Sequence, residues 1–121
     1  MERNIQFERL VKSIQSSHVK GLFVYMFLQD KNMNDVAAET GISRQTLSTW
    51  KKGGNVTHSN VERVASQYNL NPFLMYDVKS LIENLIHDSP DYMIRGRYGE
   101  YLAEYTYLEK AYNTHENPVE S

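Results

Sequence analysis

The sequence contains no cysteine, and this absence excludes disulfide bonds, thiol catalysis and thiolate metal sites. Only three prolines and six glycines occur in 121 residues, so we expect a largely helical chain with few long loops. No apolar run approaches the length of a membrane span, and the N-terminus lacks the apolar core of a signal peptide. These absences predict an all-α protein that lies in the cytoplasm and does not insert into a membrane.

The patterns that accompany catalysis are also missing. The four histidines are scattered along the chain, without a second histidine four residues away or carboxylates at metal-ligand spacing. The sequence has no glycine-rich phosphate loop and no recognisable motif of serine, histidine and carboxylate. We therefore expect no enzyme activity, no metal site and no cofactor.

Residues 32–52 carry the pattern of two short helices joined by a tight turn. Asn32, with Asp35 three residues later, predicts a capped helix start. Gly41 can adopt the positive φ that a short turn between crossed helices requires, and Ser43 can cap the second helix with its hydroxyl. The pattern predicts a helix-turn-helix. Its expected core residues are Val36, Ala37, Gly41, Ile42, Leu47 and Trp50.

The second helix of this pair, residues 44–52, has an outward face that suits a DNA groove. Leu47 and Trp50 are three residues apart and should face inward together. The remaining side chains are donors, acceptors and cations, which a helix needs in order to contact base edges in the major groove. The outward residues are Arg44, Gln45, Ser48, Thr49 and Lys52.

Charge is distributed unevenly around a formal net value of -2. Residues 40–61 contain no acid but include three cations, whereas from Glu83 onward eight acids against three bases give a local net charge of -5. This asymmetry favours a groove-reading module attached to an acidic, partner-binding segment. An acidic end that serves solubility alone is the alternative.

Over residues 18–72 the chain resembles the Cro/C1-type (XRE-like) helix-turn-helix regulators. The resemblance rests on Val-Ala-Ala-Glu-Thr-Gly-Ile-Ser-Arg-Gln-Thr-Leu-Ser-Thr-Trp-Lys-Lys-Gly at residues 36–53 and on Val-Glu-Arg-Val-Ala at residues 61–65. It implies a five-helix DNA-binding domain. It also implies a transcriptional regulator that binds an inverted repeat as a dimer, in a bacterium or in a bacterial cell infected by a phage.

The resemblance assigns roles by position. Base readers would be Arg44, Gln45, Ser48 and Thr49. Phosphate contacts would be Asn34, Ser43, Lys51, Lys52 and Asn55. The chain departs from the family at the start of the first motif helix, where phage repressors often have a phosphate-binding glutamine. Met33 stands there, and Asn34 is the available substitute.

The flanking sequence predicts further helices. Apolar residues at helical spacing predict a helix over 4–15 and a strongly apolar core helix over 18–29. Together with the motif they form an expected DNA-binding domain over residues 1–72. Pro72 is well placed to open the next helix, over 73–87, whose apolar arc is wider than one small domain easily covers.

A last helix, over 91–112, carries large side chains that alternate by three and four residues, as in a coiled-coil seam. Tyrosine is enriched at interfaces. We therefore predict a homodimerisation segment over 73–112, followed by a disordered tail over 113–121. The alternatives are that this helix packs on its own domain, or that it docks a different protein. The predicted dimer contacts are Leu81, Leu85, Tyr98, Tyr101, Tyr105 and Leu108.

These features together predict a sequence-specific regulator that binds a double-stranded DNA operator as a homodimer. Repression would follow from occupying a promoter, whereas activation would require a surface that contacts RNA polymerase. The alternative from another class is an adaptor or antirepressor with a helix-turn-helix fold. Such a protein would bind its partner through the acidic, tyrosine-rich C-terminal helix.

Overall fold

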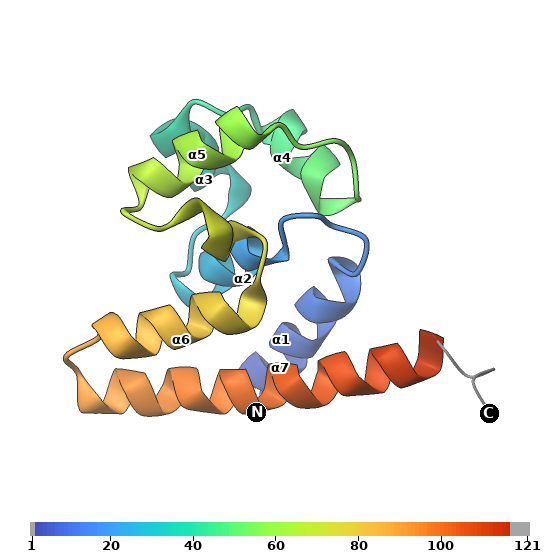
Figure 1. The fold of residues 1–121 in the computed structure, drawn as a ribbon, viewed down its shortest axis with the longest axis vertical. Helices are drawn as coiled ribbons and strands as arrows, with labels where there is room; N and C mark the ends of the chain where they lie inside the picture. Colours follow the sequence, from blue (N-terminus) through green and yellow to red (C-terminus); the bar gives the residue numbers. More distant parts are fainter. Residues whose placement is uncertain (1, 117–121) are drawn as a thin grey trace.

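A computed structural model describes residues 2–116, with side-chain environments for residues 4–113. This part of the chain is all-α, with seven α-helices, one 3-10 helix and no strand, as the composition predicted (Figure 1). None of the described helices has both the length and the apolar character needed to cross a membrane. The elements in order are α1 (Glu2–Ser13), α2 (Lys20–Leu28), α3 (Met33–Thr40), α4 (Arg44–Lys51), α5 (His58–Gln67), η1 (Pro72–Met75), α6 (Val78–Asp88) and α7 (Tyr92–Glu116).

Helix α2 occupies the centre of the molecule, where it packs against α1, α6 and η1. Seven of its nine residues are buried, as expected for a helix that is apolar on all sides. Position 21 requires glycine, because a Cβ atom there would lie 2.0 Å from the carbonyl oxygen of Leu74 in η1. The central helix and η1 are therefore in backbone contact.

The prediction of a single helix over 73–87 was wrong, because the helical segment is interrupted at Asp77. Residues Pro72–Met75 form η1, and α6 begins only at Val78. The carboxylate of Asp77 accepts a hydrogen bond from the backbone N–H of Ser80 at 3.2 Å and so caps a new helix. A short acidic side chain that binds a nearby backbone N–H favours a helix start over a helix interior.

Helix α7 is the longest element and runs along α1 and α6, at the bottom of Figure 1. It continues to Glu116, four residues beyond the predicted end and into the tail predicted over residues 113–121. Residues 117–121 of that predicted tail lie outside the described residues.

One hydrophobic core includes residues from both predicted segments, 1–72 and 73–112. Its aromatic centre joins the two ends of the chain. The ring of Tyr101 on α7 lies 4.9 Å from that of Phe7 on α1 and 5.7 Å from that of Phe27 on α2. Such tilted and edge-on pairs add to the stability gained from burial.

Candidate nucleic-acid interface

Helices α3 and α4 form a short pair whose first helix begins with a reciprocal cap. The side chain of Asn32 accepts a hydrogen bond from the backbone N–H of Asp35 at 2.8 Å, and the Asp35 carboxylate accepts one from the Asn32 N–H at 2.9 Å. This capping box confirms the helix start predicted from the two residues.

The connection between the two helices is held by Gly41 and Thr40. Gly41 has a φ of 80°, and its N–H donates to the carbonyl oxygen of Ala37 at 2.9 Å. The buried Thr40 hydroxyl donates to the Val36 carbonyl at 2.7 Å and accepts from the Ile42 N–H at 3.1 Å. The sequence analysis missed Thr40. A threonine directly before a turn glycine is a signal that could have identified it, because its hydroxyl can satisfy backbone groups that the turn leaves open.

Helix α4 is fixed at its start by Ser43, whose hydroxyl oxygen accepts a hydrogen bond from the Thr46 N–H at 3.1 Å. The inward orientation of Leu47 and Trp50 is confirmed, since these side chains are 0% and 2% exposed. Val36 and Ile42 are also buried, Ala37 is half-buried, and Gly41 lies exposed in the turn.

The opposite side of α4 faces solvent. Arg44, Gln45 and Thr49 are exposed, and Ser48 is half-buried. Among the residues predicted to contact phosphates, Lys51 is half-buried and the others are exposed, namely Asn34, Ser43, Lys52 and Asn55. The Ser43 hydroxyl also donates to the Thr46 hydroxyl at 2.8 Å, so this hydroxyl already has a partner.

The cations of α4 and its C-cap are not neutralised within the described part of the chain. Arg44, Lys51 and Lys52 form no ion pair with a described carboxylate, whereas Lys31 lies 3.0 Å from Glu39. Three positive charges on one short helix are therefore available to an external anion. This is the electrostatic condition for binding a phosphate backbone.

Glu39, an acid of the preceding helix α3, is bound to partners of its own. The Glu39 carboxylate accepts hydrogen bonds from the Tyr68 hydroxyl at 2.7 Å and from the Lys31 ammonium at 3.0 Å, and these two bonds lower the pKa of Glu39. Burial and the same Glu39 carboxylate raise the pKa of Tyr68, so its hydroxyl stays a donor. The three residues tie the α2–α3 connection, α3 and the end of α5 together.

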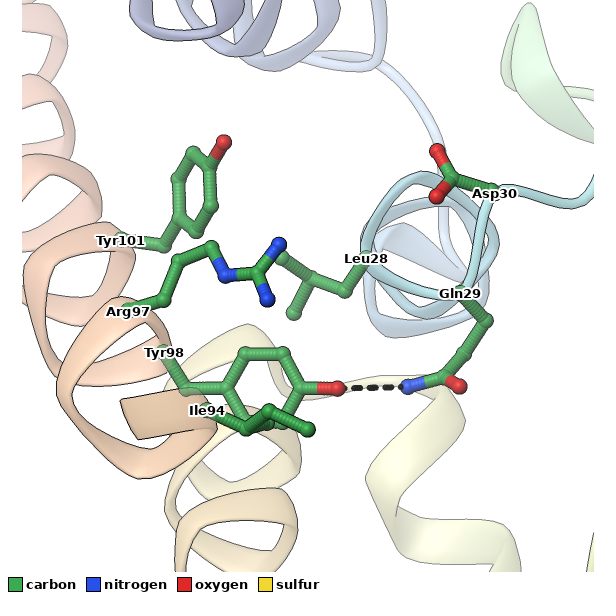
Figure 2. A pocket seen from close by; sticks show the side chains of 7 residues that line it. All are labelled: Leu28, Gln29, Asp30, Ile94, Arg97, Tyr98 and Tyr101. Atoms are coloured by element: carbon green, nitrogen blue, oxygen red, sulfur yellow. Dashed lines mark hydrogen bonds between the residues drawn. The ribbon is translucent and has the colours of Figure 1, made fainter. Parts of the chain in front are cut away.

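The predicted dimer contacts on α6 and α7 lie inside the chain. Leu81, Tyr101, Tyr105 and Leu108 are between 0% and 6% exposed, and Leu85 and Tyr98 are half-buried. Figure 2 shows Tyr98 directed from α7 toward the end of α2, where its hydroxyl accepts a hydrogen bond from the Gln29 amide at 3.0 Å. Four of these six residues are therefore covered by other helices of the same chain, whereas Leu85 and Tyr98 remain partly accessible, and a dimer through this region stays a prediction.

A polar pocket of about 210 Å³ remains between α7 and the end of α2 (Figure 2). Arg97 and Asp30 bring opposite charges to its lining. The exposed large apolar side chains on the described part of α7 are Tyr92, Met93 and Tyr107, with exposures between 69% and 79%.

Comparisons of the chain with protein-family models, with curated proteins and with solved structures found no match. The residues and geometry of the α3–α4 pair are therefore the features of the chain that point to a function.

Proposed function

We propose that this chain is a sequence-specific, double-stranded DNA-binding transcriptional regulator that resembles the Cro/C1-type helix-turn-helix proteins. Helix α4 would lie in the major groove, with α3 packed across it as the first helix of the motif. The observation that carries the proposal is the surface of α4. Its apolar side is buried through Leu47 and Trp50, while its other side exposes donors, acceptors and cations that no described carboxylate neutralises.

The chemistry of α4 suggests how bases would be read. The Arg44 guanidinium can donate two hydrogen bonds to guanine, and the Gln45 amide can form two with adenine. Both residues lie in the first turn of α4, the part of a recognition helix that contacts base edges. Each bidentate contact contributes about 1–3 kcal/mol of discrimination against a wrong base. Ser48 and Thr49, one turn later, would contact further base edges.

The phosphate contacts would position the helix without reading sequence. Lys52 and Asn55 are exposed beyond the end of α4, and Asn34 is exposed in the first turn of α3. Lys51, in the last turn of α4, would add a further phosphate contact. Repression would follow where the bound protein occupies a promoter, whereas activation would require a surface that contacts RNA polymerase.

Binding as a homodimer to an inverted repeat stays a prediction, and four of its six predicted contacts are buried within the chain. The buried side of α7, which includes Tyr101, Tyr105 and Leu108, is covered by other helices of the same chain. The exposed Tyr92, Met93 and Tyr107 are the large apolar side chains of α7 that a second copy could cover. The same three residues favour the second candidate function, an adaptor that binds another protein through α7.

Selection of bound sequences from a random double-stranded DNA pool, at near-physiological salt, tests the proposal. An enriched inverted repeat would support a dimeric sequence reader, and a single unrepeated site would support a monomeric one. Absence of enrichment by the folded protein would contradict the proposal and favour the adaptor.

Matched variants would locate the reading surface. We expect Arg44→Ala and Gln45→Ala to lose about 1–3 kcal/mol of sequence preference, because each removes a bidentate base contact. Arg95→Ala and Gln67→Ala replace exposed residues of the same types outside α4 and should change nothing. Lys52→Ala should weaken all sequences alike and reduce the salt dependence by about one phosphate contact, whereas the exposed control Lys110→Ala should not.

A further inference from the structure

A groove of about 360 Å³ lies beside α4, between α1, α2 and the start of α3. Its volume falls within the range of about 300–1,000 Å³ that is usual for small-molecule sites. Most of the lining side chains are apolar, and two of them are methionines, whose flexible side chains adapt to different ligand shapes. The apolar lining residues are Leu10, Phe23, Met26, Phe27 and Met33.

The charged residues that line the groove all carry the same sign. They are Lys31, Arg44 and Lys51, and no carboxylate lines the groove. Lys31 is already paired with Glu39 at 3.0 Å, so the uncompensated charges are those of Arg44 and Lys51. These two residues are seven positions apart on α4, which places them on one side of the helix about 10 Å apart along its axis.

We propose that this groove binds a small amphipathic anion, with an apolar body among the α1 and α2 side chains and one acidic group at α4. The apolar lining provides the hydrophobic part of the binding free energy. The two cations favour an anionic ligand over a neutral one. A carboxylate or sulfonate can accept charge-assisted hydrogen bonds from Arg44 or Lys51, and such bonds are stronger than those to a neutral group. A neutral ligand of the same shape would leave both charges without a partner.

The site gives the proposed function a means of regulation, and this part of the inference rests on that function. Arg44 and Lys51 line the groove and also belong to the proposed DNA-binding surface. An acid bound at these residues neutralises charge that the DNA would otherwise contact. The ligand and the DNA therefore weaken each other's binding by the same factor, as thermodynamic linkage requires. The bound anion acts as an effector that releases the protein from DNA.

Binding of the anion is tested on the full chain without DNA. The probe is anilinonaphthalene sulfonate, an aromatic anion whose fluorescence rises in apolar surroundings, and decanoate is titrated to displace it. Decanol, which has the same chain without the charge, is the matched control. We expect saturable probe binding, displacement by decanoate, and affinity for decanol that is weaker by about tenfold, since one charge-assisted hydrogen bond is lost. Absence of probe binding, or equal displacement by both competitors, would overturn the proposal.

Two variants test whether the ligand binds in the groove. Leu10→Trp should abolish probe binding by filling the space, whereas Leu85→Trp enlarges a similarly half-buried leucine elsewhere and should not. Lys51→Gln removes a charge from a half-buried surface residue and does not depend on repacking the core. It should weaken decanoate by about tenfold while leaving decanol unchanged, and Lys110→Gln is its control. Unchanged decanoate binding in Lys51→Gln would show that the groove is not the site.

The final arm separates this inference from the proposed function. Decanoate should release the selected operator DNA from the wild-type protein but not from Leu10→Trp. If the anion binds in the groove and no DNA sequence is ever enriched, the proposed function fails and the site stands. If the operator is bound with full specificity but neither anion binds, the proposed function stands and the site is overturned. If both bind without competing, the regulatory coupling is overturned.

Discussion

Helices α4 and α7 both carry large apolar side chains spaced three or four residues apart, yet only the pattern of α4 predicted what covers it. The buried side of α4 packs as expected, through Leu47 and Trp50, and its polar side is exposed. The buried side of α7 was also identified correctly, through Tyr101, Tyr105 and Leu108, but its expected partner was a second copy of the chain. Periodicity shows which side of a helix is buried and does not show what covers it.

The two helices differ in whether a distant segment of the chain also covers them. Helix α4 packs on α3, which precedes it by a three-residue connection. Helix α7 packs on α6, which precedes it by a connection of the same length, and also on α1, from the opposite end of the chain. A local partner is fixed by turn and cap residues, whereas a distant partner depends on the path of the whole chain.

The largest test of this contrast is a truncation on the inner side of α7. Tyr101→Ala should lower the free energy of unfolding by about 3–5 kcal/mol, because it removes a buried ring that contacts Phe7 and Phe27. Tyr107→Ala, at a residue 69% exposed, should change it by no more than about 0.5 kcal/mol. Urea unfolding measures both values. Equally small changes in the two variants would contradict the burial of Tyr101 within the chain.

Glycine substitutions should have opposite signs in the two regions. Gly41→Ala should destabilise the chain by about 1–2 kcal/mol, because Gly41 has a φ of 80°, which residues with a Cβ adopt at a cost. Gly96→Ala should stabilise it by about 1 kcal/mol, since no neighbouring atom lies within 4 Å of a Cβ atom built there and alanine favours a helix. Thermal unfolding of the two variants gives the comparison. Destabilisation by Gly96→Ala would mean that something covers this side of α7 in solution.

A smaller effect is expected at the start of α4. Ser43→Ala removes the acceptor for the Thr46 N–H and should cost about 1 kcal/mol. Ser43→Asp keeps a capping acceptor and should retain most of the stability. Because the cap also orients the first turn of α4, the alanine variant should weaken specific DNA binding as well. Equal stability of the alanine and aspartate variants would show that the cap contributes little.

The stability of the chain should depend on pH through a buried tyrosine on α7. Burial, together with Glu109 and Asp77, raises the pKa of Tyr105 to about 12. In the unfolded chain a tyrosine loses its proton near about pH 10. The contribution of the neutral phenol is therefore fully present below about pH 10 and is lost as the pH rises toward the folded value. Urea midpoints between neutral and alkaline pH should fall in the wild type and fall less in Tyr105→Phe; an identical fall in both would exclude Tyr105 as a cause.

Much of the α3–α4 pair could be predicted because its determinants are three or four residues apart. The capping box of Asn32, the positive φ of Gly41 and the Ser43 cap are local interactions, and each was found where the sequence placed it. Thr40 was missed even though its bonds are local, because the only mark that they leave in the sequence is its place directly before Gly41.

The sequence by itself determined that the chain is helical, where most of its helices begin, and which sides of them are buried. These properties follow from backbone hydrogen bonds and side-chain spacing within one or two turns. Only the tertiary structure decided that the chain breaks at Asp77, that α1, α2 and α6 cover the tyrosine stripe of α7, and that a groove opens beside α4. These features depend on contacts between segments far apart in the chain, because burial is favourable whichever apolar surface provides the cover.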